Sequence, residues 1–142
     1  MRILFLHSSS DLYGASKIFL QTIKIVQQKG HNCIVVLSSE GPLVSELESL
    51  GVQVEIANLG ILRRKYFTPL GLFNRLHKWF HASIFIQKII NEQKIELVYS
   101  NTAAVLIGGY AVSRYNKKYI LNKRYFYYNN CSDFFIVYTK IN

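Results

Sequence analysis

The clearest pattern along the chain is a series of short hydrophobic segments separated by longer amphipathic ones. Arg2–Leu6 and Asn32–Leu37 are apolar at nearly every position, which is typical of strands buried on both faces. Val52–Ile56 alternates apolar and polar residues, as in a strand covered on one face. Ile95–Tyr99 is predicted to be a fourth strand. The pattern therefore predicts four strands.

The segments between the strands have helical periodicity. Ser16 is a candidate N-cap for a helix over Lys17–Lys29, and Gly30 follows the last turn as a stop. The dipeptide Gly41-Pro42 opens a second helix, because proline is favoured in the first turn. Two further helices are predicted, over Leu70–Gln93 and Ala103–Tyr115.

Strands that alternate with helices form parallel sheets through right-handed crossovers. We therefore expect an α/β, Rossmann-like domain with helices on both faces of the sheet and the first three strands in the order three-two-one. In such sheets a ligand binds beyond the carboxyl ends of the strands, where the strand order reverses. The crevice between the first and fourth strands is bounded by the loops His7–Ser16 and Ser100–Thr102.

The first of these loops is suited to a sugar or a phosphate. Gly14 has no side chain, so a ligand could approach its backbone closely, next to a helix N-terminus that favours anions. The fingerprint G-x-G-x-x-G and the phosphate loop G-x-x-x-x-G-K-[ST] are both absent. A plain connecting loop thus stays open as the alternative. His7 is either a substrate donor or a strand-end histidine, and Asp11 is either a base or a solvated loop aspartate.

The residues up to about 116 resemble the N-terminal half-domain of family 4 glycosyltransferases of the GT-B fold. The matching pieces are the first strand, the turn YGAS, the segments G-H-x-x-x-V and G-P-L-x-x-x-L, and SNT after the fourth strand. In that family two Rossmann-like domains face each other, and the N-terminal one mainly holds the acceptor. The resemblance implies a nucleotide-sugar donor and no cofactor. With the polar loop residues, it predicts a substrate-binding set of Ser9, Ser10, Gly14, Ala15, Ser16, Ser100, Asn101 and Thr102.

The resemblance stops before the last segment, residues 117–142. This segment is crowded with Lys, Asn, Tyr, Ile and Phe, and it has neither the H-x-x-E nor the E-x7-E motif of the family. It is interpreted as out of frame or as an incomplete domain end, and one or two short aromatic strands are the alternative. The resemblance implies sugar transfer to a glycan or lipid-linked acceptor in cell-surface polysaccharide synthesis. It also implies that this chain is inactive without a donor-binding C-terminal domain. The catalytic residues are not identified.

Charge is distributed unevenly along the chain. Residues 61–142 hold 13 of the 17 basic residues and three of the eight acidic ones. Basic and aromatic residues adjoin at Arg63, Arg64, Lys65, Tyr66 and Phe67, which suits an anionic membrane surface. A non-catalytic membrane-surface or partner-binding subunit is therefore the alternative function, and a solvated basic loop is the simpler explanation. Nucleic acid is a weaker candidate partner, because no recognised motif is present.

Other classes of protein and site are disfavoured by the sequence. The apolar segments are too short for a signal peptide or a membrane span, so we expect a cytoplasmic protein, peripheral on the inner membrane face if it binds lipid. Cys33 lies in an apolar strand and is expected to be buried as a free thiol. His77 and His81 have metal-ligand spacing but no third ligand, so no metal is predicted. If the sheet ended at the fourth strand, Leu97–Tyr99 would form an exposed, aggregation-prone edge.

Overall fold

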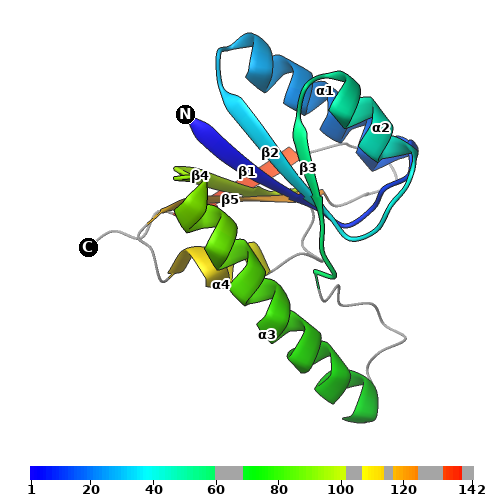
Figure 1. The fold of residues 1–142 in the computed structure, drawn as a ribbon, viewed down its shortest axis with the longest axis vertical. Helices are drawn as coiled ribbons and strands as arrows, with labels where there is room; N and C mark the ends of the chain where they lie inside the picture. Colours follow the sequence, from blue (N-terminus) through cyan, green and yellow to red (C-terminus); the bar gives the residue numbers. More distant parts are fainter. Residues whose placement is uncertain (60–68, 102–106, 114–116, 125–132, 139–142) are drawn as a thin grey trace.

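The computed structural model describes residues 1–59, 69–101, 107–113, 117–124 and 133–138. Strands and helices alternate from the N-terminus, as the sequence predicts (Figure 1). The strands are β1 (Arg2–His7), β2 (Asn32–Leu37), β3 (Gln53–Ile56), β4 (Leu97–Ser100), β5 (Lys118–Arg124) and β6 (Asp133–Tyr138). The helices are α1 (Gly14–Gln28), α2 (Pro42–Ser49), α3 (Pro69–Glu92) and α4 (Ile107–Ser113).

The strands form one sheet in the order β3-β2-β1-β4-β5-β6. The first five run parallel, and β6 pairs antiparallel with β5. The order reverses at β1, which lies between β2 and β4. The predicted order of the first three strands and the predicted Rossmann-like α/β class are both confirmed. The loops after β1 and β4 consequently leave the sheet side by side at its carboxyl edge.

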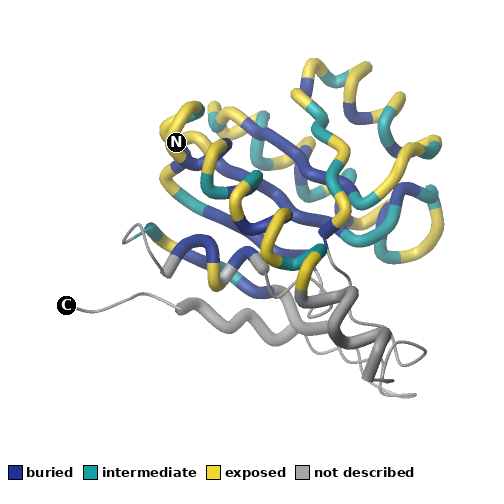
Figure 2. Tube along the Cα trace, turned by 60° about the horizontal axis from the view of Figure 1, so that its bottom comes forward, coloured by how far each residue is buried: buried dark blue, intermediate teal, exposed yellow. Residues whose placement is uncertain are grey.

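Helices cover both faces of the sheet (Figure 1), and each face has its own hydrophobic core. On one face α1 and α2 pack against β1 and β2 through Phe5, Phe19 and Leu43. On the other face α3 and α4 pack through residues such as Leu6 and Ile86. Burial is therefore continuous along the central strands, while the outer helix surfaces are exposed (Figure 2). Burying a residue such as Phe5 contributes roughly 1.5–3 kcal/mol of transfer free energy.

The last part of the chain extends the sheet. The open edge at Leu97–Tyr99 does not form, because β5 pairs with β4 along Leu97–Ser100 and β6 pairs with β5. The apolar β4 is thus an interior strand. The interpretation of residues 117–142 as out of frame or incomplete stays a prediction.

Two local predictions have different outcomes. Ser16 is not the N-cap of α1, because the helix begins at Gly14 with Tyr13 in the N-cap position. Cys33 is buried and free, as predicted, and burial raises the pKa of its thiol to about 11. A thiol of that kind is a core side chain and not a nucleophile.

Candidate functional site

Three loops meet at the carboxyl edge of the sheet, where the sequence placed the candidate site. The loop after β1 lies next to the loop after β2 on one side and to the start of the segment after β4 on the other. The backbone amide of Asn101 donates to the Leu6 carbonyl at 2.9 Å, which fixes the end of β4 against β1. The polar residues of this edge are therefore held by regular sheet pairing.

A chain of buried hydrogen bonds joins the first and fourth strands. His7 is 1% exposed, and its ring stacks on Phe19 with 4.6 Å between the ring centroids. Asn101 Nδ2 lies 3.0 Å from His7 Nδ1, and His7 Nε2 lies 3.1 Å from Ser16 Oγ. Ser16 Oγ in turn donates to Asp11 Oδ1 at 3.0 Å. The chain of contacts thus links residues 94 positions apart in the sequence.

These contacts engage both ring nitrogens of the histidine. Ser16 has a single hydroxyl proton, which it gives to Asp11, so its oxygen accepts from His7 Nε2–H. On the other side of the ring, His7 Nδ1 is in contact with the side-chain amide of Asn101. His7 therefore connects the two loops through both of its ring nitrogens. Of the two interpretations of His7, a donor to substrate and a strand-end residue, this geometry supports the second.

Asp11 is held as a carboxylate at the start of α1. Ser9 Oγ donates to Asp11 Oδ2 at 2.5 Å, and the amide of Tyr13 donates to Oδ1 at 3.0 Å. These bonds, that of Ser9 above all, lower the pKa of Asp11 below its ordinary value of 3.8, with smaller contributions from Ser16 and His7 and against the effect of burial. A general base works best with a pKa near the working pH. Asp11 is thus better suited to shaping the loop than to accepting a proton.

Ser10 fastens the first loop to the second. Its hydroxyl donates to the carbonyl of Glu40 at 2.8 Å and lies 2.9 Å from Ser39 Oγ, and its carbonyl accepts from the amide of Leu43 at 3.0 Å. The backbones approach so closely that a Cβ on Gly41 would lie 2.5 Å from the Ser10 carbonyl oxygen. Gly41 is therefore required for packing. Ser10, predicted as a substrate ligand, has these structural partners.

Gly14 is exposed among the predicted site residues, and Ala15 beside it is half-buried. Gly14 has a φ of +27°, and no atom lies within 4 Å of the position where its Cβ would be. Its lack of a side chain therefore serves the turn and leaves space outside it. The first amides of a helix have no partner within the helix, and the positive end of the helix dipole favours a negative ligand. This opening, with α1 behind it, is where a phosphate could approach.

The segment after β4 contributes less than the sequence predicted. Ser100 is fully buried, and its Oγ would lie 2.7 Å from a Cβ on Gly108, against the face covered by α4. Asn101 is 4% exposed and is engaged with His7. Thr102 and the predicted membrane residues Arg63, Arg64, Lys65, Tyr66 and Phe67 lie outside the described residues. The substrate roles of Ser100, Asn101 and Thr102 stay predictions.

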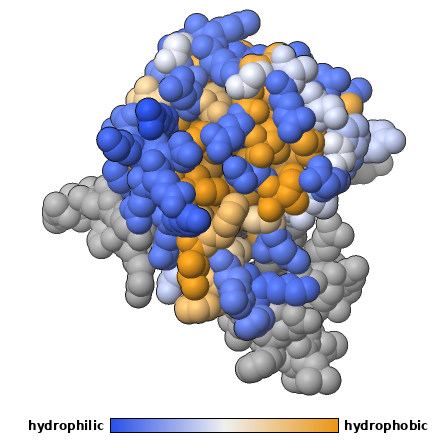
Figure 3. All heavy atoms as spheres, in the orientation of Figure 1, coloured by the Kyte–Doolittle hydropathy of each residue, from blue (hydrophilic) through white to orange (hydrophobic). Residues whose placement is uncertain are grey.

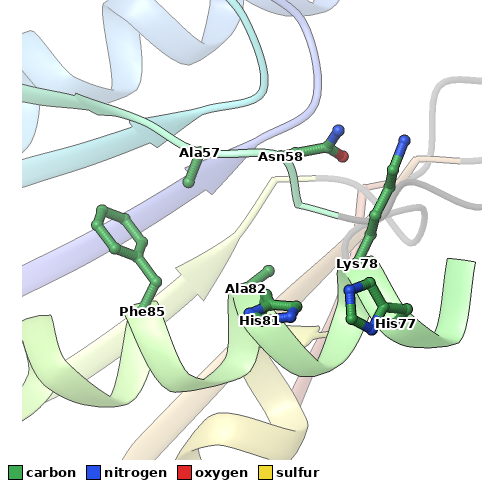
Figure 4. Close-up of a pocket in the computed structure, with 7 residues that line it drawn as sticks. All are labelled: Ala57, Asn58, His77, Lys78, His81, Ala82 and Phe85. Carbon is green, nitrogen blue, oxygen red and sulfur yellow. The ribbon is translucent and has the colours of Figure 1, made fainter.

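A separate cavity lies between α3 and the segment that follows β3. Its volume is about 410 Å³, and Figure 4 shows the seven residues that line it, which are Ala57, Asn58, His77, Lys78, His81, Ala82 and Phe85. We call it the α3 cavity. The rings of His77 and His81 lie 4.4 Å apart between centroids. Within the described part of the chain, no group of three or more His, Cys, Asp or Glu side chains could hold a metal ion.

The sequence pattern did not reveal the contacts that organise the loops. The bond between His7 and Asn101 joins distant residues, and the bond from Ser38 Oγ to the Ser8 carbonyl, at 2.7 Å, joins two loops. The available signal was that a histidine ends an apolar strand and that Ser-Asn-Thr follows another. That signal shows where the edge of the sheet lies, but it does not show which residues contact one another.

Comparison with known proteins gives a likeness of fold alone. No family model matches the chain, and no curated protein matches it. Among solved structures, MurG of Acinetobacter baumannii has a TM-score of 0.63 at 14% identity, over 86% of this chain and 34% of its own. A glycosyltransferase from Rickettsia africae has a TM-score of 0.60 at 15% identity, over 87% and 29% respectively. HepE of Anabaena, in complex with UDP-glucose, has a TM-score of 0.59 at 23% identity, over 85% and 28%.

All three matches cover only part of the known protein. The chain spans about a third or less of the length of these structures. Its fold is thus that of one Rossmann-like domain of glycosyltransferases, as expected for half of a GT-B architecture.

Proposed function

We propose that this chain is the acceptor-side domain of a family 4 glycosyltransferase. In this role it would take part in the transfer of a sugar from a nucleotide-sugar donor to a glycan or lipid-linked acceptor in cell-surface polysaccharide synthesis. The observation that carries the proposal is the open α1 N-terminus at Gly14, which stands at the point where the strand order reverses. The likeness to HepE, crystallised with UDP-glucose, supports the same ligand class.

The residues divide into two roles in this proposal. Gly14 and Ala15 lie at the surface of the opening and are placed to face the donor phosphates. Ser16, His7 and Asn101 lie behind them and keep the loop in one conformation. A loop that is already ordered loses little conformational entropy when it binds a ligand. Ser9 and Ser10 likewise act through the shape of the loop.

Catalysis in this proposal needs a second domain. A transferase of this type encloses the donor between two domains, and the known structures are about three times as long as the part that this chain matches. We therefore expect the chain by itself to be inactive, and to act when a donor-binding domain is joined to it or bound by it.

A chimera tests the proposal. This chain replaces the matched 28% of HepE, and incorporation of labelled glucose from UDP-glucose into bacterial lipid and polysaccharide fractions is measured. We expect incorporation above that of the HepE remainder alone. Ala15→Arg should abolish it by blocking the opening, whereas Ser45→Arg on the exposed face of α2 should not. A folded chimera that binds UDP but incorporates nothing above the remainder would refute the proposal.

A second candidate is a membrane-surface role, and an apolar patch on α3 favours it. Phe80 and Ile84 are 57% and 51% exposed, one helical turn apart, and Lys88, which pairs with Glu92 at 3.8 Å, lies one turn further on. In Figure 3 hydrophobic and hydrophilic side chains adjoin over the part of α3 that is drawn in colour. Such a pattern suits the interface of an anionic bilayer. Within the described residues, no helix has the length and apolar character needed to cross a membrane.

Vesicle sedimentation tests this second candidate. We expect the chain to sediment with vesicles of phosphatidylglycerol, and Phe80→Ser with Ile84→Ser to remove most of the binding. The matched control is Ile18→Ser with Ile25→Ser, which removes two exposed apolar side chains from α1. Equal loss in both double variants, or none in either, would exclude α3 as the membrane-facing surface.

A further inference from the structure

The α3 cavity has a chemistry that differs from that of the loop site. Its charged and titratable lining residues all come from one face of α3, where His77, Lys78 and His81 adjoin. The opposite wall, from the segment after β3, contributes Ala57 and Asn58, neither of which titrates. Among the described residues no acidic side chain lines the cavity. The described lining therefore offers basic side chains and no acidic one.

The cavity is also divided into a polar and an apolar end. Figure 4 shows Lys78 extending from α3 toward the segment with Asn58, with the rings of His77 and His81 beside it. At the other end the Phe85 ring extends from α3 toward Ala57. Helical spacing explains the arrangement, since residues three, four and seven or eight apart share one face.

These features define a class of ligand. Lysine and histidine donate hydrogen bonds to phosphate oxygens, and an amide can add another. The half-buried Phe85 and the buried Ala82 offer apolar contact area to whatever is attached to the phosphate. A volume of about 410 Å³ exceeds what one phosphate needs. We propose that the α3 cavity binds a phosphate ester, with the phosphate at His77, Lys78 and His81 and its organic part against Phe85.

The alternative use of the same residues is a metal ion. Two histidines four apart on a helix can bind zinc, but a stable zinc site normally has at least three protein ligands. The structure provides two histidines and a lysine, and lysine is an anion binder when it is charged. The phosphate assignment uses all three basic side chains.

The experiment is a titration of the full chain followed by two-dimensional NMR of its backbone amides. Sulfate and inorganic phosphate are the soluble probes, and sulfate keeps its two charges across neutral pH. We expect shifts at the amides of Asn58 and of residues 77–82. Lys78→Gln, and separately His77→Gln with His81→Gln, should weaken binding about tenfold. Lys24→Gln on α1 and His31→Gln before β2 remove the same groups elsewhere and should leave it unchanged.

A thermal melt of each variant checks that the fold is intact. These side chains are exposed or half-buried, so the melts should agree with the wild type within a few degrees.

Vesicles distinguish the two sources of a phosphate ester. Phosphatidic acid and phosphatidylcholine vesicles are compared for the wild type and the same variants. Binding of soluble phosphate assigns a soluble ligand, and Lys78-dependent binding confined to phosphatidic acid assigns a lipid headgroup; either supports the proposal. The proposal would be overturned if the cavity variants bound both the soluble anions and the vesicles as strongly as the control variants Lys24→Gln and His31→Gln do. The proposal would also be overturned if zinc chloride shifted the resonances of both histidine rings while phosphate and sulfate shifted none.

Discussion

The contact between the first two loops gives the sharpest test of the packing at the candidate site. Gly41 has an extended backbone, with φ at 165°, which any residue can adopt. A Cβ at this position would lie 2.5 Å from Ser10 O, 2.6 Å from its Oγ and 2.8 Å from its Cβ. Rotating the Ser10 side chain does not relieve the clash, because the carbonyl oxygen is fixed by its bond to the Leu43 amide. Gly41→Ala must therefore push the two loops apart.

The cost follows from the contacts that are lost. Overpacking a tight contact costs about 1–3 kcal/mol. Lengthening the bonds from Leu43 to Ser10 and from Ser10 to Glu40 adds about 1 kcal/mol, because each bond contributes about 0.5–1.5 kcal/mol when it is fully made. We expect Gly41→Ala to lower the free energy of unfolding by about 2–4 kcal/mol. For a chain of this length that lowers Tm by about 6–12 °C.

Urea and thermal denaturation measure the effect, and a second glycine provides the control. Gly51 has a φ of +72° and nothing within 4 Å of its Cβ position, so Asn, which tolerates this conformation, should fit there. Gly51→Asn should change the free energy of unfolding by less than about 1 kcal/mol. If Gly41→Ala is no more destabilising than Gly51→Asn, the close contact of the two loops is refuted.

Three further predictions concern the polar residues of the sheet edge. Ser16→Ala removes the hydrogen bonds to His7 and Asp11 and should cost about 1–3 kcal/mol in urea denaturation; a cost below about 0.5 kcal/mol would show that the chain of bonds does not hold the loop. Asp11 has a lowered pKa when folded, so its contribution is present above pH 3.8 and is lost as the pH falls through the lowered value. The difference in Tm between wild type and Asp11→Asn should thus shrink from pH 6 to pH 2.5, and a constant difference would contradict this. Ser100 Oγ is buried without a hydrogen-bond partner among the described residues, so Ser100→Ala should be neutral or stabilising by up to about 1 kcal/mol, whereas Ser83→Ala, which removes a 2.7 Å bond, should destabilise.

The elements around the first two strands could be predicted because each has a strong local signal. Arg2–His7 and Asn32–Leu37 are continuous apolar runs, and such runs leave few alternatives to a buried parallel strand. Gly30 adopts the left-handed conformation after α1, which is why glycine marked that helix end correctly. The start of α1 was misplaced, because the Ser16 hydroxyl bonds to Asp11 and His7 and not to the helix backbone.

The remaining features depend on contacts between distant parts of the chain. The strands β5 and β6 have no clear period of their own, and their pairing with β4 and with each other defines them. The pairing of His7 with Asn101 follows from the position of β4 beside β1, which no local pattern encodes. The sequence therefore located the edge of the site, and the structure assigned most of its polar residues to holding the loops.

In the proposed function the opening at Gly14 and Ala15 faces the phosphates of a nucleotide sugar. The most direct test is a titration of the full chain with UDP-glucose, followed through its backbone amide resonances. A single domain should bind weakly, with a Kd on the order of 1–10 mM. We expect the amide resonances of Gly14 and Ala15 to shift most, UDP to reproduce these shifts and glucose to have no such effect. Unshifted Gly14 and Ala15 amides at saturating UDP-glucose would contradict the proposed function.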